Sequence, residues 1–157
     1  MEKITIVKKK LGNFKKKIIV PGDKSLSIRW VLFASLAKGI SKAKNLLMSE
    51  DVLAAINAVR KLGIKVRILK NETKIIGKGL HGYKYKKNII INAQNSGTLG
   101  RLILGLLIDT PYKIRIIGDK SLSKRDFKRV SVPLSKFGSK FKLNKNKNLP
   151  LSILGSS

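Results

Sequence analysis

Residues 18–36 read IIVPGDKSLSIRWVLFASL, and this stretch decides the fold class. It opens with a β-branched run, turns at a Pro-Gly pair and continues as a long apolar segment. The run at residues 18–20 predicts a strand. The segment predicts a helix that begins near Lys24 and ends at Gly39, because glycine is favoured just past a helix end. A strand that leads through a tight turn into a helix is typical of an α/β protein.

The same alternation continues along the rest of the chain. Ser49 is placed to cap a second helix whose first turn is acidic and whose last turn is basic, as the helix dipole favours. Hydrophobic spacing predicts helices over residues 49–62, 99–107 and 127–137, and strands over 64–69, 73–76, 88–91, 113–117 and 149–154. We therefore expect an α/β fold.

Several residues in these helices allow further predictions about how the helices pack. Trp30 and Phe33 lie in an apolar helix face, so both are expected in the core. Gly100 and Gly105 should allow another element to approach the third helix closely. Pro133 should kink the fourth helix or limit its length.

One six-residue motif occurs twice. The sequence GDKSLS occupies residues 22–27 and returns at residues 118–123, each time after a predicted strand. We interpret the second half of the chain as a repeat of the first, with units at roughly 20–87 and 88–157.

The composition excludes several classes of protein. The chain has 157 residues, 43% of them hydrophobic, which suits one domain with a core. It has no cysteine and one histidine, so disulfide frameworks and thiol nucleophiles are excluded and no metal site is expected. His81 lies in a glycine-flanked loop and is expected on the surface. No apolar run reaches the roughly 18 residues of a membrane span, and residues 1–10 lack a secretory signal, so we expect a cytoplasmic protein.

The charge balance favours anionic partners. Lys and Arg number 35, Asp and Glu number 8, and the formal net charge is +27. Either a lysine-rich composition throughout or selection for nucleic-acid binding would give this balance. The lysines are spread along the chain rather than clustered beside aromatic residues, so we favour the first explanation. A small basic nucleic-acid-binding protein is the alternative hypothesis.

The turn before the first helix has the features of an anion site. The N–H groups and the dipole at a helix start attract a phosphate or a carboxylate. Lys24 would add a positive charge, and Ser25 a hydroxyl donor. Arg29, one turn later, could bind an anion through two hydrogen bonds. A Gly-Asp turn that caps an ordinary helix explains the same residues equally well.

Two later turns are similar in character. Residues 95–98, Asn-Ser-Gly-Thr, precede the third helix, and Gly97 would let a ligand approach the backbone closely. Taken alone, an ordinary capped helix start is the simpler interpretation of this turn. Residues 118–125 are again basic and precede a helix. Three basic helix starts indicate more than one bound anion.

Together these motifs resemble those of the 5-enolpyruvylshikimate-3-phosphate synthases. The resemblance is carried by residues 21–29, residues 92–98 with Arg101, residues 118–122 with Arg125, and residues 150–155. The first two of these segments are similar to the family's signatures. The Asp-Lys-Ser triplet at residues 23–25 is closer to this branch than to the related UDP-N-acetylglucosamine enolpyruvyl transferases.

The resemblance implies a reaction and a fold. The reaction would transfer the enolpyruvyl group from phosphoenolpyruvate to the 5-hydroxyl of shikimate 3-phosphate and release phosphate, on the route to chorismate and the aromatic amino acids. No metal and no organic cofactor is implied. The fold would be the inside-out α/β barrel of the enolpyruvyl transferases, built of repeated βαβαββ units, about two of which would be present.

By position, the resemblance also assigns roles to individual residues. Lys24, Ser25 and Arg29 would bind shikimate 3-phosphate, while Lys24, Gly97 and Arg125 would bind phosphoenolpyruvate. The resemblance also implies that Lys24 is the catalytic residue. The second loop would be shaped by Asn95, Thr98 and Arg101. The family usually has proline after the arginine that corresponds to Arg125. This chain has Asp126 there, so an altered geometry is expected at Arg125.

The resemblance finally implies that the chain is incomplete. Family members are much longer and have two lobes that close on the substrates. Residues 1–19 would belong to the other lobe, and residues 20–157 would form an incomplete first large lobe. The family's catalytic carboxylates would lie in a missing carboxy-terminal lobe, so we expect negligible activity from this chain alone.

Overall fold

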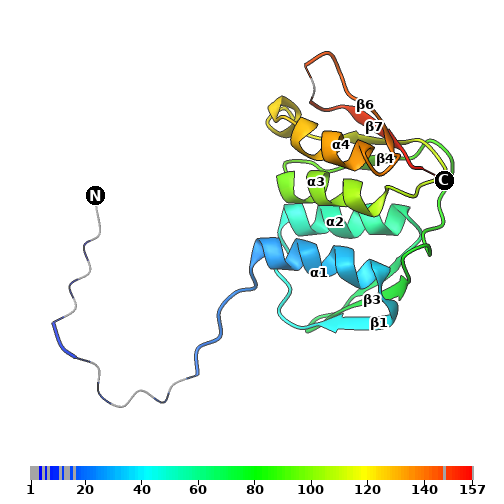
Figure 1. The fold of residues 1–157 in the computed structure, drawn as a ribbon. Coiled ribbons are helices and arrows are strands. Elements are labelled where there is room, and N and C mark those ends of the chain that lie inside the picture. Colours follow the sequence, from blue (N-terminus) through cyan, green and yellow to red (C-terminus); the bar gives the residue numbers. More distant parts are fainter. Residues whose placement is uncertain are drawn as a thin grey trace.

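The computed structural model describes residues 4, 6, 8–10, 12, 15, 17–146 and 148–156. From Lys24 onward helices alternate with strands, so the predicted α/β class is confirmed (Figure 1). Among these residues, no helix has both the length and the apolar content that a membrane span requires. The assignment of residues 1–19 to another lobe stays a prediction, and part of that segment lies outside the described residues.

The first sheet has three strands in the order β1, β3, β2, each antiparallel to its neighbour. They are β1 (Lys38–Ala43), β2 (Lys65–Ile68) and β3 (Thr73–Lys78). The hairpin of β2 and β3 is the predicted one. The sequence does not predict β1, because it contains a single β-branched residue, Ile40, and Gly39 has a positive φ of 92°. Pairing with β3 along its whole length makes it a strand.

The predicted strand at residues 18–20 does not form. Ile18, Ile19 and Val20 are 69%, 82% and 65% exposed, and no described strand pairs with them. The Asn45 side chain donates one hydrogen bond from Nδ2 to the Val20 carbonyl oxygen, at 2.7 Å. β-branched residues favour a strand where a neighbouring strand completes the packing and the hydrogen bonds. Within the described chain, residues 18–20 have no such neighbour.

The second sheet has four strands in the order β4, β5, β7, β6. They are β4 (Ile90–Asn92), β5 (Ile114–Ile117), β6 (Lys140–Lys142) and β7 (Leu151–Leu154). β4 is parallel to β5, and β7 is antiparallel to both β5 and β6. The predicted strand at 149–154 thus pairs with strands that precede it in sequence. The short and basic β6 is not predicted.

The helices connect and cover these strands. They are α1 (Lys24–Leu36) and α2 (Glu50–Lys61) beside the first sheet, and α3 (Gly97–Leu106), the 3₁₀ turn η1 (Leu122–Lys124) and α4 (Lys128–Ser135) beside the second. Figure 1 shows the four α-helices side by side in one layer. Residues 90–154 therefore run β4, α3, β5, α4, β6, β7, a complete βαβαββ unit.

The two halves of the chain share one sheet topology. The order β1, β3, β2 corresponds to β5, β7, β6, so a counterpart of β4 is the one element that the first sheet lacks within the described residues. The repeated GDKSLS motif is out of phase with this repeat. Its first copy begins α1, the counterpart of α3, whereas its second copy begins η1 and precedes α4. The motif therefore marks similar helix starts, not equivalent positions of the two units.

The core lies between the helices and the sheets. Ile28, Val31 and Leu32 of α1 pack with fully buried side chains of the other helices and of both sheets. The expectation for Trp30 holds in part, since it is half-buried against this core. The expectation for Phe33 is wrong, since it is 64% exposed. α1 is apolar on two faces, and Phe33 lies on the face that points away from the core.

The third helix approaches its neighbours at one of its two glycines. A Cβ on Gly100 would lie 3.4 Å from the Phe127 ring and 3.5 Å from Ala93, so the predicted close approach is confirmed there. A Cβ on Gly105 would meet nothing within 4 Å, so the same prediction for Gly105 is wrong. Leu107, at the C-terminal end of the helix, supplies the buried contacts in that region.

We predict opposite effects for two glycine-to-alanine substitutions. A Cβ on Gly77 in β3 would overlap the carbonyl oxygens of Ala34 and Ala37, where the sheet crosses the end of α1. Gly77→Ala should therefore lower the free energy of unfolding by about 1–3 kcal/mol through overpacking. Gly105→Ala should raise it by about 0.5–1 kcal/mol, because alanine favours the helix and fills open space. Urea unfolding measures both, and equal stability of Gly77→Ala and the parent chain would contradict the packing described here.

Candidate anion-binding site

A cleft of about 350 Å³ lies where the N-terminal ends of α1 and α3 meet the loop that follows η1. Its lining comes from four separate segments of the chain and is mostly polar. The lining residues are Lys24, Arg29, Asp51, Asn95, Gly97, Thr98, Arg101, Leu102 and Arg125. Four of these side chains are cationic and one is a carboxylate. The cleft is therefore suited to anions.

The start of α1 contributes Lys24 and Arg29. Asp23 caps this helix, and its Oδ1 accepts a hydrogen bond of 2.7 Å from the Leu26 backbone N–H. The cap fixes the first turn, so Lys24 stands at the helix start and Arg29 follows more than one turn later on the same side of the cleft. The positive end of the helix dipole adds to both charges.

The start of α3 is built to let a guanidinium lie against it. Gln94 has a positive φ of 49°, which turns the chain into the helix, and Ser96 caps it by accepting from the Leu99 N–H at 3.2 Å. A Cβ on Gly97 would lie 2.7 Å from Nη1 of Arg125 and 3.8 Å from Nη1 of Arg101. Glycine at this position leaves the space in which the Arg125 guanidinium rests on the helix N-terminus, and a Cβ here would require that side chain to shift.

Contacts with Phe127 and Asp126 hold the Arg101 side chain in place. Its guanidinium carbon lies 5.8 Å from the centre of the Phe127 ring, and its Nη2 donates to the Asp126 carbonyl oxygen at 3.5 Å. Its Nε is buried, and the part of the chain that the structure describes offers it no hydrogen-bond partner. A buried donor without a partner costs free energy, so this nitrogen is a cost that the packing of Arg101 must offset.

Asp126, which departs from the family pattern, does not neutralise Arg125. Its Oδ1 accepts a hydrogen bond of 2.7 Å from the Lys128 backbone N–H at the start of α4. The carboxylate is thus used at a helix start, where a negative charge is favourable. The Asp126 side chain is not among the residues that line the cleft, and an altered geometry at Arg125 stays a prediction.

Asp119 joins two of the loops around the cleft. Its Oδ2 accepts from the Asn95 amide at 2.6 Å, and its Oδ1 accepts from the Leu122 N–H at 2.7 Å. The Leu122 N–H is the main cause that holds the pKa of Asp119 below its ordinary value, with further contributions from Asn95 and Arg125. The charged form of Asp119 therefore fixes the position of Asn95.

Asp51 is the charged residue of the cleft that the sequence does not reveal. Its Oδ2 lies 3.0 Å from Nζ of Lys24, and its side chain is 18% exposed against 56% for the lysine. In the sequence Asp51 is simply an acid in the first turn of α2, where the helix dipole explains it. The contact with Lys24 bridges two helices, and local spacing carries no signal of it.

The structure brings most of the predicted site residues together. Apart from Ser25, every residue to which the sequence assigns a role lines the cleft. Ser25 is half-buried and adjoins Lys24 in α1, outside the lining. His81 is on the surface, as expected, with an 80% exposed side chain whose Nδ1 lies 3.9 Å from Asp109. No group of three His, Cys, Asp or Glu within the described residues could hold a metal ion.

We predict that Asp51→Asn strengthens the binding of inorganic phosphate by the purified chain. Loss of the carboxylate removes a negative charge from the cleft and releases Lys24, so the affinity should rise by about two- to fivefold, the equivalent of a partly exposed ion pair. Glu50→Gln is the matched control, because Glu50 is in the same helix turn but does not line the cleft. Calorimetry measures both, and a weaker or unchanged affinity in Asp51→Asn would contradict the role of the pair.

We also predict a pH-dependent contribution of Asp119 to stability. Because its folded pKa is lowered, this carboxylate stabilises the fold above its ordinary pKa of 3.8, and the contribution is lost as the pH falls through the folded pKa. The melting temperatures of Asp119→Ala and the parent chain should differ most near pH 6 and converge in acid below 3.8. Asp119→Asn, which keeps an acceptor but cannot ionise, separates charge from hydrogen bonding. If the difference in melting temperature between Asp119→Ala and the parent chain were the same at all pH values, the charge of Asp119 would not be the cause of the stabilisation.

Known proteins resemble this chain along nearly its whole length. Residues 8–157 match the family described as EPSP synthase (3-phosphoshikimate 1-carboxyvinyltransferase). The 3-phosphoshikimate 1-carboxyvinyltransferase of Bacillus cytotoxicus is 42% identical over 141 residues, which are 89% of this chain and 33% of the relative. That of Desulforamulus reducens is 41% identical over 155 residues, which are 97% and 35% of the two chains.

A solved structure gives the same result for the fold. The EPSP synthase of Acinetobacter baumannii superposes with a TM-score of 0.82 at 37% identity, over 90% of this chain and 32% of that one. The predicted enolpyruvyl transferase fold is thereby confirmed. This chain spans about a third of the length of these relatives. Since the family match runs through every segment that lines the cleft, from Lys24 to Arg125, the chain belongs to the EPSP synthase family.

Proposed function

We propose that this chain supplies the phosphate-binding part of an enzyme that makes 5-enolpyruvylshikimate 3-phosphate. The enzyme transfers the enolpyruvyl group of phosphoenolpyruvate to the 5-hydroxyl of shikimate 3-phosphate and releases phosphate. The observation that carries the proposal is the convergence of Lys24, Arg29, Arg101 and Arg125 on one cleft at two helix starts. Membership of the EPSP synthase family supplies the reaction.

The charge of the cleft suits these two substrates. Both carry a phosphate, and phosphoenolpyruvate carries a carboxylate as well, so several negative charges must be neutralised close together. Arginine side chains bind such groups through two parallel hydrogen bonds, and helix starts add backbone donors. The single carboxylate of the lining, Asp51, is already paired with Lys24.

We assign the substrates to opposite walls of the cleft. Shikimate 3-phosphate lies on the α1 side, with Lys24, Ser25 and Arg29 as its ligands. Phosphoenolpyruvate lies on the α3 side against Gly97 and Arg125, and Lys24 contacts both substrates. Ser25 keeps its role in this assignment through its place beside Lys24, although it is not in the lining. The second loop is shaped by Asn95, Thr98 and Arg101.

The proposed reaction requires an acid and a base beyond the groups that line this cleft. One group must protonate the methylene carbon of phosphoenolpyruvate, and another must accept the proton of the attacking hydroxyl. Among the described residues, Asp51 is the one carboxylate in the lining. We therefore propose that a carboxy-terminal lobe, matching the part of the relatives that this chain does not cover, provides the remaining groups. Turnover by this chain alone should be negligible.

Exposed apolar side chains support a partner of this kind. Leu26 and Phe33 of α1 are 67% and 64% exposed, and Val132 of α4 is 56% exposed. Apolar side chains on a helix face usually pack against another element. We propose that the remainder of the enzyme covers them.

None of the relatives or structures described above points to nucleic acid, so the alternative of a nucleic-acid-binding protein gains no support. A cytoplasmic location fits the proposed reaction, because both substrates are charged phosphate esters that do not cross membranes unaided.

We predict saturable binding of shikimate 3-phosphate to the purified chain in a calorimetric titration at moderate salt. Lys24→Ala and Arg29→Ala should each weaken the binding about tenfold or more, because each removes a charge-assisted hydrogen bond to the phosphate. Lys120→Ala is the matched control. Lys120 is exposed and belongs to the second GDKSLS copy, but it does not line the cleft.

The variants Lys24→Ala, Arg29→Ala and Lys120→Ala distinguish a specific binding site from general electrostatic attraction to a basic protein. Equal weakening in all of them would contradict the proposed site, and so would a complete absence of binding by the parent chain. Measurable synthase activity from the chain alone would contradict the proposal that another lobe supplies the acid and the base.

A further inference from the structure

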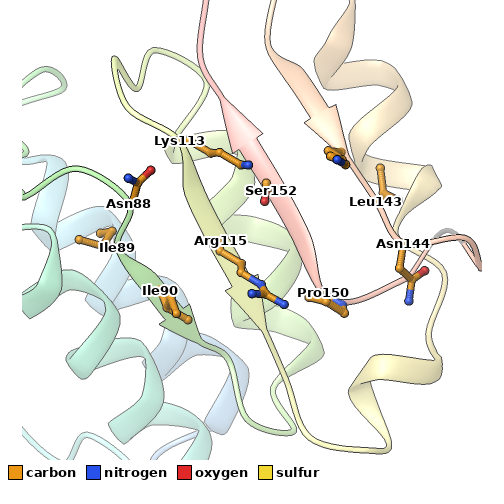
Figure 2. Close-up of a pocket in the computed structure, with 10 residues that line it drawn as sticks. Asn88, Ile89, Ile90, Lys113, Arg115, Leu143, Asn144, Pro150 and Ser152 are labelled. Carbon is orange, nitrogen blue, oxygen red and sulfur yellow. The ribbon is translucent and has the colours of Figure 1, made fainter.

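A second basic hollow lies on the other side of the molecule's second sheet. It is a groove of about 490 Å³ between the ends of β4, β5, β6 and β7 (Figure 2). It shares no residue with the cleft at the helix starts. The side chains that point toward the helices, such as Ile91, Ile116 and Ile153, are fully buried. Because side chains alternate along a strand, those of the groove lie on the outward face.

Strand register places two cations on either side of a hydroxyl. Arg115 of β5 is directly opposite Ser152 of β7, and Ser152 is directly opposite Lys142 of β6. Neighbouring strands are about 4.8 Å apart, so the backbones of Arg115 and Lys142 are separated by roughly 10 Å. Long side chains from both positions can reach an anion above Ser152. All three side chains can donate a hydrogen bond to an anion, and none of them carries a negative charge.

A third cation completes this set. Figure 2 shows Arg115 of β5 and Lys113, which directly precedes β5, both reaching toward β7, Lys113 near Ser152 and Arg115 near Pro150. Among the described residues, no carboxylate lines the groove, and these side chains form no ion pair or hydrogen bond. Like charges on one face of a sheet repel each other. A bound anion would remove that repulsion, and three cations match a dianion better than a single carboxylate.

Apart from Asn88 and Asn144, the other residues that line the groove are apolar. Ile90, directly beside Arg115 in the parallel pair, is 43% exposed, and Leu143 and Pro150 form the opposite wall. Asn144, at the rim, is already used, because its side chain bonds the Leu149 carbonyl oxygen and two backbone N–H groups of its own turn. A ligand that fills the groove therefore needs an apolar part next to its anion. The volume is in the range of small-molecule sites.

We propose that this groove binds a small phosphate monoester whose substituent is an apolar chain or ring. The phosphate lies above Ser152 between Arg115 and Lys142, with Lys113 as a further donor, and the substituent packs against Ile90 and Pro150. The site is separate from the proposed substrate cleft and does not depend on its assignment.

Phenyl phosphate is the probe for this site. Its titration into the purified Lys24→Ala chain, in which the cleft is weakened, is followed through the backbone amide signals of β5, β6 and β7 by NMR. We expect saturable shifts on these strands. Arg115→Gln and Lys142→Gln should each weaken binding on the order of tenfold, because each loses a charge-assisted hydrogen bond. Lys140→Gln, in the same strand as Lys142 and outside the groove lining, should leave binding unchanged.

Two comparisons decide between a built site and general attraction. Equal weakening by Lys140→Gln and Lys142→Gln would overturn the proposal, as would the absence of saturable shifts on the sheet. Inorganic phosphate should bind at least several-fold more weakly than phenyl phosphate, and equal affinity would overturn the role of the apolar wall. All variants are at exposed positions, and their unchanged amide spectra would show that the sheet is intact.

Discussion

The packing of α1, α2 and α3 through their buried faces is the contact on which the rest of this structure depends. Side chains such as Ile28, Ile56 and Ile103 have no exposed surface, so the helices have little freedom to slide or rotate. With the helices fixed, the N-termini of α1 and α3 are fixed as well, and both open on the cleft. The arrangement of charge in this protein thus follows from apolar contacts.

The cleft and the groove bring cations together by different means. In the cleft, capped helix starts and the missing side chain of Gly97 allow guanidinium groups to gather on helix dipoles. In the groove, strand register places Arg115 of β5 and Lys142 of β6 at equal heights on either side of Ser152 in β7. A formal charge of +27 makes basic side chains common everywhere on the surface. What distinguishes these two places is that the backbone holds the charges around a hollow.

The sequence predicts those parts of the fold that local patterns control. The charge gradient and the apolar stripe of α2 agree with the structure, and the helix begins directly after Ser49 as predicted. The Ser49 hydroxyl, however, makes no capping hydrogen bond within the described chain. The sequence misses the strand β1 and predicts a strand at residues 18–20 that does not form. In both cases the presence or absence of a partner strand decides whether the segment becomes a strand. Likewise, the motifs identify Lys24 and Arg125 in the cleft, whereas Asp51 reaches it through a contact between helices that no local pattern contains.

The unpaired edge of β1 has a consequence for self-association of the protein. Within the described chain, β1 pairs on one side only, with β3, so its other edge presents free backbone N–H and C=O groups to solvent. Such an edge is a template on which a strand of another molecule can add, the first step of aggregation. Lys38 and Lys42 flank Ile40 on this edge, and a second copy would bring the same charges against them. Like charges placed opposite each other oppose this pairing, which is how lysines on an edge strand discourage aggregation.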